Sequence, residues 1–281
     1  MSLAVKEILN IGCRQLEECG FADAAIDSKL LYCHLMNVTN TQLILEYQKI
    51  LPDALCDEYF KLLDIRSSGV PLQHITGVQD FMGLEFMVNE HVLIPRQDTE
   101  TLVESVIVAL HEFKDPDVLD LCAGSGAIGL SIQSLLPSAN VTLSDVSKDA
   151  LEVVRRNAHE LNLDVDIRHG DLFKAVGRDT FDLIASNPPY IPRGDLSALQ
   201  REVLREPMLA LDGGQDGLDI YRRIAQEAGA HLNPGGFLYL EVGIGEVEPV
   251  LTLATQNIQC AQAGVFNDLN GIPRVVWARS V

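Results

Sequence analysis

The sequence predicts an α/β protein with a small all-helical region at its N-terminus and a doubly wound parallel sheet after it. Residues 3 to about 70 show only helical periodicity, and from about residue 116 short apolar strands alternate with helical segments. Such alternation is typical of a parallel sheet covered by helices. The chain has 281 residues, of which 47% are hydrophobic, enough for one medium domain plus a small one.

Three helices are expected in the first region. In LAVKEILNIGCRQLEECG (3–20) apolar residues recur at helical spacing, and Gly20 ends the run. The segments ADAAIDSKLLYCHLM (22–36) and PDALCDEYFKLLDIRSSG (52–69) show the same spacing. We therefore predict a helical domain over residues 1–70.

A connector follows over residues 71–95. The stretch GLEFMVNEHVLIP (83–95) contains two apolar runs, one on each side of Asn89 and Glu90. This pattern predicts a β-hairpin linker that turns at these two residues, followed by the second domain over residues 96–281.

Strands and helices alternate in the second domain. The expected strands are DVLDL (117–121), NVTLSD (140–145), VDIRH (165–169), FDLIAS (181–186) and GFLYLEV (236–242). The expected helices are GAIGLSIQSLL (126–136), SKDALEVVRRNAHELN (147–162), with Ser147 as its cap, and GLDIYRRIAQEAGAHL (217–232).

Charge and hydropathy exclude several classes of protein. The net charge is −19, and Lys and Arg form no basic run beyond isolated pairs in RRNAH and YRRIA, which argues against DNA or rRNA as a direct ligand. No apolar run reaches the roughly 18 residues that a membrane span needs. The start MSLAVKEILN lacks a basic leader and an apolar signal core, so we expect no secretory signal.

The cysteine pattern predicts free thiols. The chain has six cysteines, which form no CxxC pair and no cluster with histidines: Cys13, Cys19, Cys33, Cys56, Cys122 and Cys260. We expect a reducing, cytoplasmic location and no metal site.

A glycine-rich turn after the first strand predicts a nucleotide-type site. In DLCAGSGAIG (120–129), Gly124 and Gly126 allow a sharp turn and close approach to a ligand. Asp145 ends the next strand, where a carboxylate accepts hydrogen bonds from ribose hydroxyls. NAD and a plain tight turn are alternatives, but Cys122 stands where GxGxxG has its first glycine. A turn with no pyrophosphate to cradle suits S-adenosylmethionine.

A further acidic residue, Asp171 in HGDLF, follows the third strand of the sheet. It is either an acceptor for the adenine amino group or an exposed turn aspartate, and the sequence leaves both open.

The stretch IASNPPYIP (184–192) predicts a clamp for a planar nitrogen. Two prolines end the fourth strand, so Asn187 lies at the edge of the sheet where ligands bind. The side-chain oxygen of Asn187 and the Pro188 carbonyl form an acceptor pair for an amide or aryl amine, and Tyr190 offers a flat face. A simple strand terminator is the alternative, but it does not explain the order Asn-Pro-Pro-aromatic.

The motifs DLCAGSG, SDVS and SNPPY together resemble the peptide chain release factor glutamine methyltransferases of the HemK/PrmC type. PLQHITG (71–77), VLIPRQDTE (92–100), EPMLALDGGQDGLDIY (206–221) and DLNGIPR (268–274) also fit this family. Gln97 stands where the family pattern has a proline, which questions the rigidity of that loop.

The resemblance implies a helical N-terminal substrate-recognition domain, a β-hairpin linker and a seven-stranded Rossmann-like S-adenosylmethionine-dependent methyltransferase domain. It implies methylation of the side-chain amide nitrogen of the glutamine in the Gly-Gly-Gln motif of bacterial class I release factors, with S-adenosylhomocysteine as product. No membrane and no direct nucleic acid partner are expected.

The resemblance also implies the site residues. The cofactor residues are Asp120, Cys122, Ala123, Gly124, Ser125, Gly126, Asp145, Val146, Asp171, Leu172 and Asn187, with Arg96 and Thr99 at the methionine end. The substrate residues are Asn187, Pro188, Pro189 and Tyr190, of which Asn187, Pro188 and Tyr190 are expected to be catalytic.

Three other activities remain open: methylation of a glutamine in a ribosomal protein, methylation of an adenine or cytosine amino group in nucleic acid, and binding of S-adenosylmethionine without catalysis. Residues 213–215 also read Gly-Gly-Gln, the tripeptide of the implied substrate. They form either a pseudosubstrate or a glycine turn before a helix.

Overall fold

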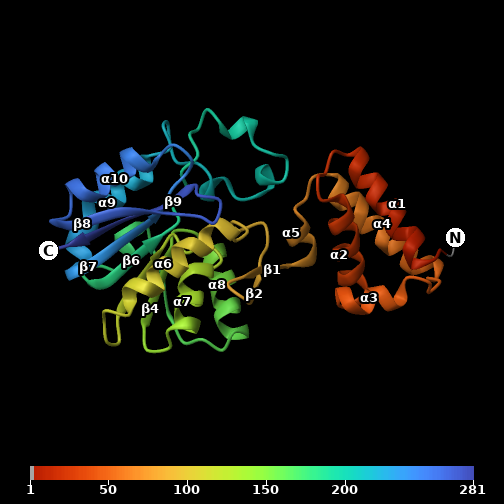
Figure 1. The fold of residues 1–281 in the computed structure, drawn as a ribbon, viewed down its shortest axis with the longest axis horizontal. Helices are drawn as coiled ribbons and strands as arrows, with labels where there is room; N and C mark the ends of the chain where they lie inside the picture. The colour runs from red at the N-terminus through yellow and green to blue at the C-terminus, as the bar shows by residue number, and fades with distance from the viewer. Residues whose placement is uncertain (1–2) are drawn as a thin grey trace. The chain divides into compact units, whose positions relative to one another are not determined.

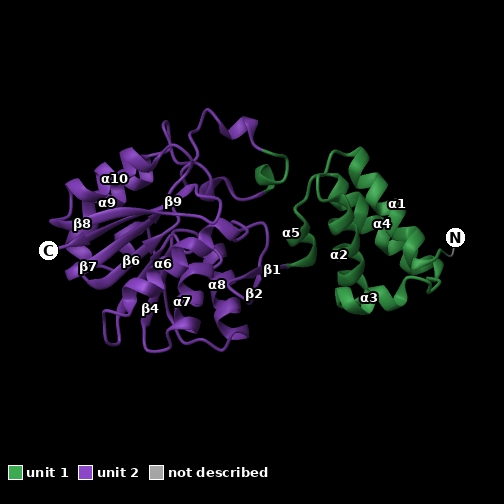
Figure 2. Ribbon diagram, in the orientation of Figure 1, with its two compact units in different colours: residues 1–77, 200–205 green, residues 78–199, 206–281 purple. Residues whose placement is uncertain are grey.

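The computed structural model describes residues 3–281, which form two compact units (Figure 2). The first unit contains the described residues up to Gly77 together with residues 200–205, and the second contains residues 78–199 and 206–281. Among the described residues, no helix is long and apolar enough to cross a membrane.

The first unit is helical (Figure 1). Its helices are α1 (Val5–Glu18), α2 (Ala24–Met36), α3 (Asn40–Glu46), α4 (Asp53–Ser67) and α5 (Leu72–Thr76). Helices α1, α2 and α4 pack on one another around a buried core that includes Leu16, Leu31 and Tyr59. The three helices expected from periodicity are confirmed.

Two short helices of this unit have no counterpart in the sequence prediction. Helix α3 buries only Leu43, so it carries no amphipathic repeat. Helix α5 has five residues and ends at Gly77, whose φ of 80° is left-handed. The helical unit therefore extends to Gly77, beyond the boundary expected at residue 70.

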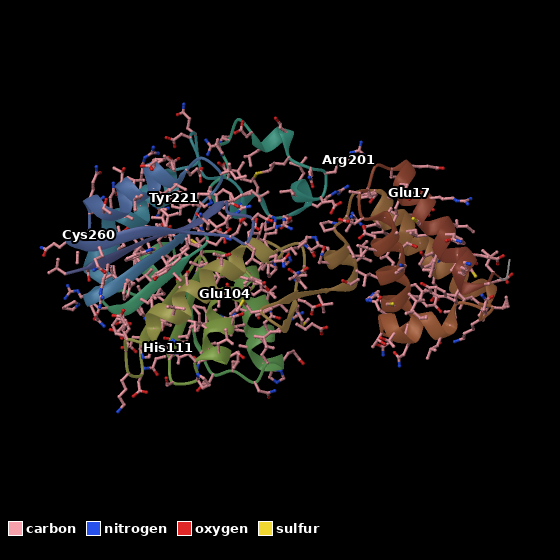
Figure 3. The ribbon with its side chains drawn as sticks, viewed as in Figure 1. Glu17, Glu104, His111, Arg201, Tyr221 and Cys260 are labelled. Atoms are coloured by element: carbon pink, nitrogen blue, oxygen red, sulfur yellow. The ribbon has the colours of Figure 1, made fainter. Side chains whose placement is uncertain are left out.

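A buried ion-pair network crosses the core of the first unit. Arg66 is 4% exposed, and its Nε donates to Asp27 Oδ2 at 2.7 Å. Its second amino group donates to Glu202 at 2.7 Å, and its guanidinium lies 4.0 Å from the centre of the Phe21 ring. Glu202 belongs to segment 200–205, in which Figure 3 labels Arg201, so this contact holds that segment on the helical unit.

The second unit is built on a seven-stranded sheet. Its strands are β3 (Asp117–Leu121), β4 (Asn140–Asp145), β5 (Asp166–His169), β6 (Phe181–Ser186), β7 (Leu232–Glu241), β8 (Cys260–Asn267) and β9 (Pro273–Ser280). They lie in the order β5-β4-β3-β6-β7-β9-β8. Figure 1 labels β4, β6, β7, β8 and β9 among them. All five strands predicted from the alternation are present, which confirms the α/β fold.

The five predicted strands pair in parallel, as expected, but two further strands make the sheet mixed at one edge. Strand β9 is antiparallel to β7, and β8 is antiparallel to β9. These last strands are joined by a short turn instead of a crossover helix, which allows only antiparallel pairing. Asp268 stabilises the turn because its Oδ1 accepts from the backbone N–H groups of Asn270 and Ile272.

Helices cover both faces of this sheet. Helices α6 (Glu100–Leu110), α7 (Ala127–Leu135) and α8 (Lys148–Glu160) pack on one face, and α9 (Asp219–His231) and α10 (Val247–Gln256) on the other. Adjacent residues of β3, Val118 and Leu119, belong to the two opposite cores, as expected for a strand buried on both sides. Ser147 caps α8 by accepting from the N–H of Ala150, as predicted, whereas α6 was not predicted.

The hairpin of the connector lies earlier than expected. Strands β1 (Val78–Phe81) and β2 (Leu84–Met87) pair through Phe81 and Leu84, so the turn is Met82–Gly83 and the prediction at Asn89–Glu90 was wrong. Met82 and Gly83 have φ values of 52° and 75°. Positive φ at both positions matches the right-handed twist of the two strands.

Short 3-10 segments complete the second unit and the 200–205 segment. They are η1 (Gln97–Thr99), η2 (Leu172–Ala175), η3 (Leu196–Ala198), η4 (Val203–Arg205) and η5 (Met208–Ala210).

Replacing Arg66 should destabilise the helical unit strongly. Arg66→Ala leaves the buried carboxylate of Asp27 without its cation, which costs about 3–5 kcal/mol in comparable buried pairs. The free energy of unfolding, measured with denaturant, should fall by this amount. Arg155→Ala, which removes an exposed pair with Glu152, should cost less than about 1 kcal/mol. Equal losses in the two variants would contradict a structural role for the buried pair.

Candidate active site

Strand register brings the predicted motifs to one edge of the sheet. Strand β3 lies between β4 and β6, and Leu121 pairs with Ser144 on one side and Ser186 on the other. The glycine turn, Asp145 and Asn187 each follow one of these paired residues. They therefore meet at the carboxyl edge, where ligands bind in open α/β sheets.

The glycine turn is left-handed at three positions. Cys122, Gly124 and Gly126 have φ values of 64°, 56° and 82°. A Cβ added at Gly124 would meet no atom within 4 Å, so this residue faces open space. Gly126 begins α7 and is crowded by Leu130 and Val154. Cys122 takes this conformation despite its side chain, at a cost on the order of 1–2 kcal/mol.

Asp145 accepts hydrogen bonds from the turn and retains lone pairs that can accept from a ligand. Its Oδ2 accepts from the N–H of Gly124 at 2.9 Å, and its Oδ1 accepts from the N–H of Ser147 at 2.8 Å. Burial raises the pKa of this carboxyl, and these backbone hydrogen bonds oppose the rise. A carboxylate has about four acceptor positions, so lone pairs remain for hydroxyl donors in the pocket.

Asp120 lies behind the turn and not on the pocket wall. It is completely buried, and its Oδ2 accepts from the N–H of Gly129 at 2.8 Å in the first turns of α7. Burial raises its pKa to about 7. Its Oδ1 has no hydrogen-bond partner within residues 3–281. The structure thus gives Asp120 a position from which it holds α7 against β3.

These elements surround a pocket of about 260 Å³. Twelve of the predicted residues line it: Arg96, Thr99, Cys122, Ala123, Gly124, Ser125, Asp145, Val146, Asp171, Leu172, Asn187 and Pro189. Asp120, Gly126, Pro188 and Tyr190 are not on its wall.

Other wall residues come from segments that carry no nucleotide-site pattern. They include Leu93, Pro207, Leu209, Ile220 and Arg223. Leu93 follows the hairpin, and Ile220 and Arg223 are on α9, nearly a hundred residues beyond the glycine turn. Only the tertiary fold brings them to the pocket, although four of them lie in the segments 92–100 and 206–221, which fit the family pattern.

Asp171 is on the pocket wall, but its carboxylate is already paired. It accepts from Arg223 at 2.6 Å and from Lys174 at 3.0 Å. The hydrogen bond from Arg223 is the main reason that the pKa of Asp171 is lowered. Leu172 beside it has a φ of 51°, which is left-handed, and also lies on the pocket wall.

The Asn-Pro-Pro-Tyr segment presents unused acceptors. The Nδ2 of Asn187 donates to Thr99 Oγ1 at 3.4 Å. Neither the Oδ1 of Asn187 nor the Pro188 carbonyl accepts a hydrogen bond from the residues that the structure describes. The ring of Tyr190 packs against the backbone of Gly243, and burial raises its pKa to about 12, so it remains a neutral phenol.

The internal Gly-Gly-Gln supports this segment from behind. Ile191 forms a parallel bridge with Asp212, and its carbonyl accepts from the N–H of Gly213 at 2.9 Å. A Cβ at Gly213 would lie 2.7 Å from the backbone of Tyr190, whereas Gln215 is exposed. The two glycines are needed for close packing, which favours the turn interpretation over a pseudosubstrate.

Ion pairs hold the loop in which Gln97 replaces a proline. Arg96 pairs with the buried carboxylate of Glu206, and Asp98 pairs with Arg274 at 2.5 Å. The loop is therefore fixed on both sides of Gln97 by charge contacts. Within residues 3–281, no group of His, Cys, Asp and Glu could hold a metal ion.

Two family models match the chain. Residues 7–77 match the PrmC N-terminal domain, and residues 97–212 match the methyltransferase small domain.

Relatives in two bacteria match nearly the whole chain. A release factor glutamine methyltransferase from Geobacter sulfurreducens is 40% identical over 277 residues, which is 98% of this chain and 96% of that protein. One from Clostridium acetobutylicum is 40% identical over 259 residues, 90% of each chain.

Solved structures at low identity share the fold. A methyltransferase from Pyrococcus furiosus has a TM-score of 0.51 at 19% identity and covers 71% of this chain and 90% of that one. A 16S rRNA N2 G1207 methyltransferase from Thermus thermophilus, solved with AdoMet and guanosine, has a TM-score of 0.52 at 19% identity, covering 73% and 50%.

Filling the space at Gly213 should destabilise the clamp, whereas changing Gln215 should not. Gly213→Ala forces a methyl group against Tyr190, and overpacking of this kind costs about 1–3 kcal/mol. Gln215→Ala, at an exposed position, should change the free energy of unfolding by less than about 0.5 kcal/mol.

Mass spectrometry after incubation with S-adenosylmethionine should find Gln215 unmodified. A methyl group on Gln215 would restore the pseudosubstrate interpretation.

Proposed function

Because the chain belongs to the family of release factor glutamine methyltransferases, we propose that its substrate is the glutamine of the Gly-Gly-Gln motif in class I release factors. It is an S-adenosylmethionine-dependent methyltransferase, and the side-chain amide nitrogen of that glutamine receives the methyl group. The observation that carries the proposal is the pair of unused acceptors, Asn187 Oδ1 and the Pro188 carbonyl, at the edge of the pocket.

The pocket residues fit S-adenosylmethionine. The unused lone pairs of Asp145 suit the ribose hydroxyls, and Gly124 leaves space where a side chain would intrude. The apolar side chains of Val146, Leu172 and Ile220 suit the flat face of adenine. When bound, S-adenosylmethionine supplies an electrophilic methyl group on a sulfonium sulfur.

Asn187 and Pro188 would hold the substrate amide by its two hydrogens. The nitrogen lone pair of an amide is delocalised into the carbonyl, as the rotation barrier of about 18–20 kcal/mol for a peptide bond shows. Two acceptors aimed at the N–H groups orient the nitrogen and push electron density toward its open face. The prolines fix these acceptors before the substrate arrives, so little ordering is needed during reaction.

Tyr190 would support the planar amide, and no strong general base is required. Its ring is held against Gly243 and stays neutral, so it offers a flat apolar face. The methylated, protonated amide is acidic enough to release its proton to water. The pocket residues therefore act by positioning, which can contribute roughly 7–11 kcal/mol in favourable cases.

The partner and the location follow from the same proposal. A chain with a net charge of −19 repels the phosphate backbone of a nucleic acid, and it lacks the excess of cations that would displace the counterions of that backbone. The six cysteines are free, as expected in a reducing compartment, and we propose the cytoplasm.

Two variants should separate catalysis from cofactor binding. Asn187→Ala should lower kcat toward a purified release factor a hundredfold or more, about 3 kcal/mol, because one preorganised contact is lost. Asp145→Ala should weaken S-adenosylmethionine binding by about 1.5–3 kcal/mol, measured by calorimetry.

Labelled S-adenosylmethionine offered with release factor, ribosomal proteins and DNA should label the release factor. Label on another component, or full turnover by the Asn187 variant, would sink the assignment.

The helical unit should contact the body of the release factor. Its α3 exposes Ile44 and Leu45, which are 64% and 84% exposed, and apolar residues of this kind mark docking surfaces when they cluster. The double variant Ile44→Asp, Leu45→Asp should raise KM for the whole release factor about tenfold, roughly 1.4 kcal/mol. KM for a short Gly-Gly-Gln peptide should not change, because the peptide lacks the body of the release factor that α3 would contact.

Val108→Asp provides the matched control, since Val108 is 72% exposed on α6 of the other unit. Point variants are preferable to deletion of residues 1–70, because deletion would strip segment 200–205 of Arg66. If the double variant affects protein and peptide equally, α3 has no role in recognition.

A further inference from the structure

Glu241 is a buried carboxyl next to the clamp. It is the last residue of β7 and is 3% exposed. Strand β7 pairs with β6 in parallel, with Leu240 opposite Ser186. Glu241 therefore follows Leu240 just as Asn187 follows Ser186, and the two side chains extend from the same level of adjacent strands.

The carboxyl group of Glu241 faces the side chains of Thr99 and Asn187. Burial is the main influence on its pKa and raises it to about 7, while the nearby polar side chains of Thr99 and Asn187 lower it. Its Oε2 has no hydrogen-bond partner among residues 3–281. A buried carboxyl with an unmet oxygen costs stability, so its presence beside reacting groups points to a functional role.

The side-chain amide of Asn187 can adopt two orientations, and Glu241 can select one of them. The side-chain amide of Asn187 has an acceptor on one side and two donors on the other, and it can rotate to exchange them. Only the orientation with Oδ1 toward the substrate can accept from a substrate amide. The Thr99 hydroxyl contacts Nδ2, but a hydroxyl donates or accepts equally well and does not select one orientation.

We propose that the ionised carboxylate of Glu241 is a positioning residue, which holds Nδ2 of Asn187 inward and thereby turns Oδ1 toward the substrate glutamine. An ionised carboxylate only accepts hydrogen bonds, so the opposite orientation would place two oxygens against each other. The inference rests on the proposed function of the clamp and adds a residue from a different strand to it.

The other charged groups around Glu241 leave it as the group that titrates. Arg274 favours the ionised form and Asp98 opposes it, and these two are paired with each other at 2.5 Å. Tyr221, labelled in Figure 3, donates its hydroxyl to the backbone carbonyl of Glu241 at 2.7 Å. The pKa values of Tyr221 and Tyr190 are both raised by burial, so both phenols stay neutral near pH 7.

Protonation of Glu241 should therefore weaken the clamp. A protonated carboxyl carries an O–H donor and can bond to either side of the Asn187 amide. The pKa of Glu241 is raised to about 7, so the ionised form is present above this pH and is lost as the pH falls. Turnover should decrease on the acid side of about pH 7, while affinity for S-adenosylmethionine should change little.

The test compares Glu241→Gln with the wild type across this pH range. Glutamine keeps the size of the side chain but offers both a donor and an acceptor. We expect kcat toward a Gly-Gly-Gln peptide to fall about tenfold at pH 8, with KM for S-adenosylmethionine within twofold. The decrease of kcat between pH 8 and 6 that we expect for the wild type should disappear. Unchanged kcat, or a retained acid limb, overturns the inference.

Glu246→Gln is the matched control. Burial also raises the pKa of Glu246 to about 7, and its Oε2 accepts from the N–H of Gly243, beside the ring of Tyr190. This variant should keep the acid limb, since Glu246 does not face Asn187. Loss of the limb in Glu246→Gln would assign the titration to Glu246 and reject Glu241 as its origin.

A measurement on the wild type covers the case in which Glu241→Gln does not fold. The side-chain amide resonances of Asn187, observed by NMR with asparagine labelling, should shift with the same midpoint as kcat. A resonance insensitive to pH between 6 and 8 would refute the contact. If the wild type methylates neither peptide nor release factor, the proposed function fails and the role of Glu241 is decided by the NMR titration alone.

Discussion

The parallel pairing of β6 with β3 and β7 is the constraint on which the rest of the site depends. Ser186 lies opposite Leu121 on one side and Leu240 on the other, and its hydroxyl donates to the carbonyl of Leu121 at 2.5 Å. Each of these three residues is the last ladder partner before a functional element. A slip of one residue would turn every side chain of β6 to the opposite face and carry Asn187 away from both the cofactor pocket and Glu241.

Buried carboxyl groups around this site lower the stability of the fold when they are ionised. Burial raises the pKa values of Asp120, Glu241 and Glu246 to about 7, which is far above the value of an unfolded carboxyl. A group with a raised folded pKa contributes its full stability below the unfolded pKa, and this contribution is lost as the pH rises through about 7. Above about pH 7 the fold therefore contains buried ionised carboxylates, which destabilise it relative to the protonated forms.

The sequence alone was sufficient to predict elements whose structure depends only on neighbouring residues of the chain. Strand β3 spans the predicted residues 117–121, and Ser147 caps its helix, because each depends on neighbours in the chain. The hairpin turn was predicted at the wrong residues because Met82 has a positive φ, which is not expected for a methionine. The partners of Arg66 and of Asn187 were not foreseen, since Asp27 and Glu241 lie 39 and 54 residues away and only the fold brings them close.

The same distinction applies to the chemistry of the clamp. The Asn-Pro-Pro-Tyr segment supplies the acceptors, but its own sequence does not decide which side of the Asn187 amide faces the substrate. In our proposal that choice depends on Glu241, from β7, since the Thr99 hydroxyl can bond to either side of the amide. A chain with the same four-residue signature and an apolar residue in place of Glu241 would keep the acceptor atoms and lose their orientation. Under this proposal the signature alone does not orient the clamp, and a residue of the neighbouring strand completes it.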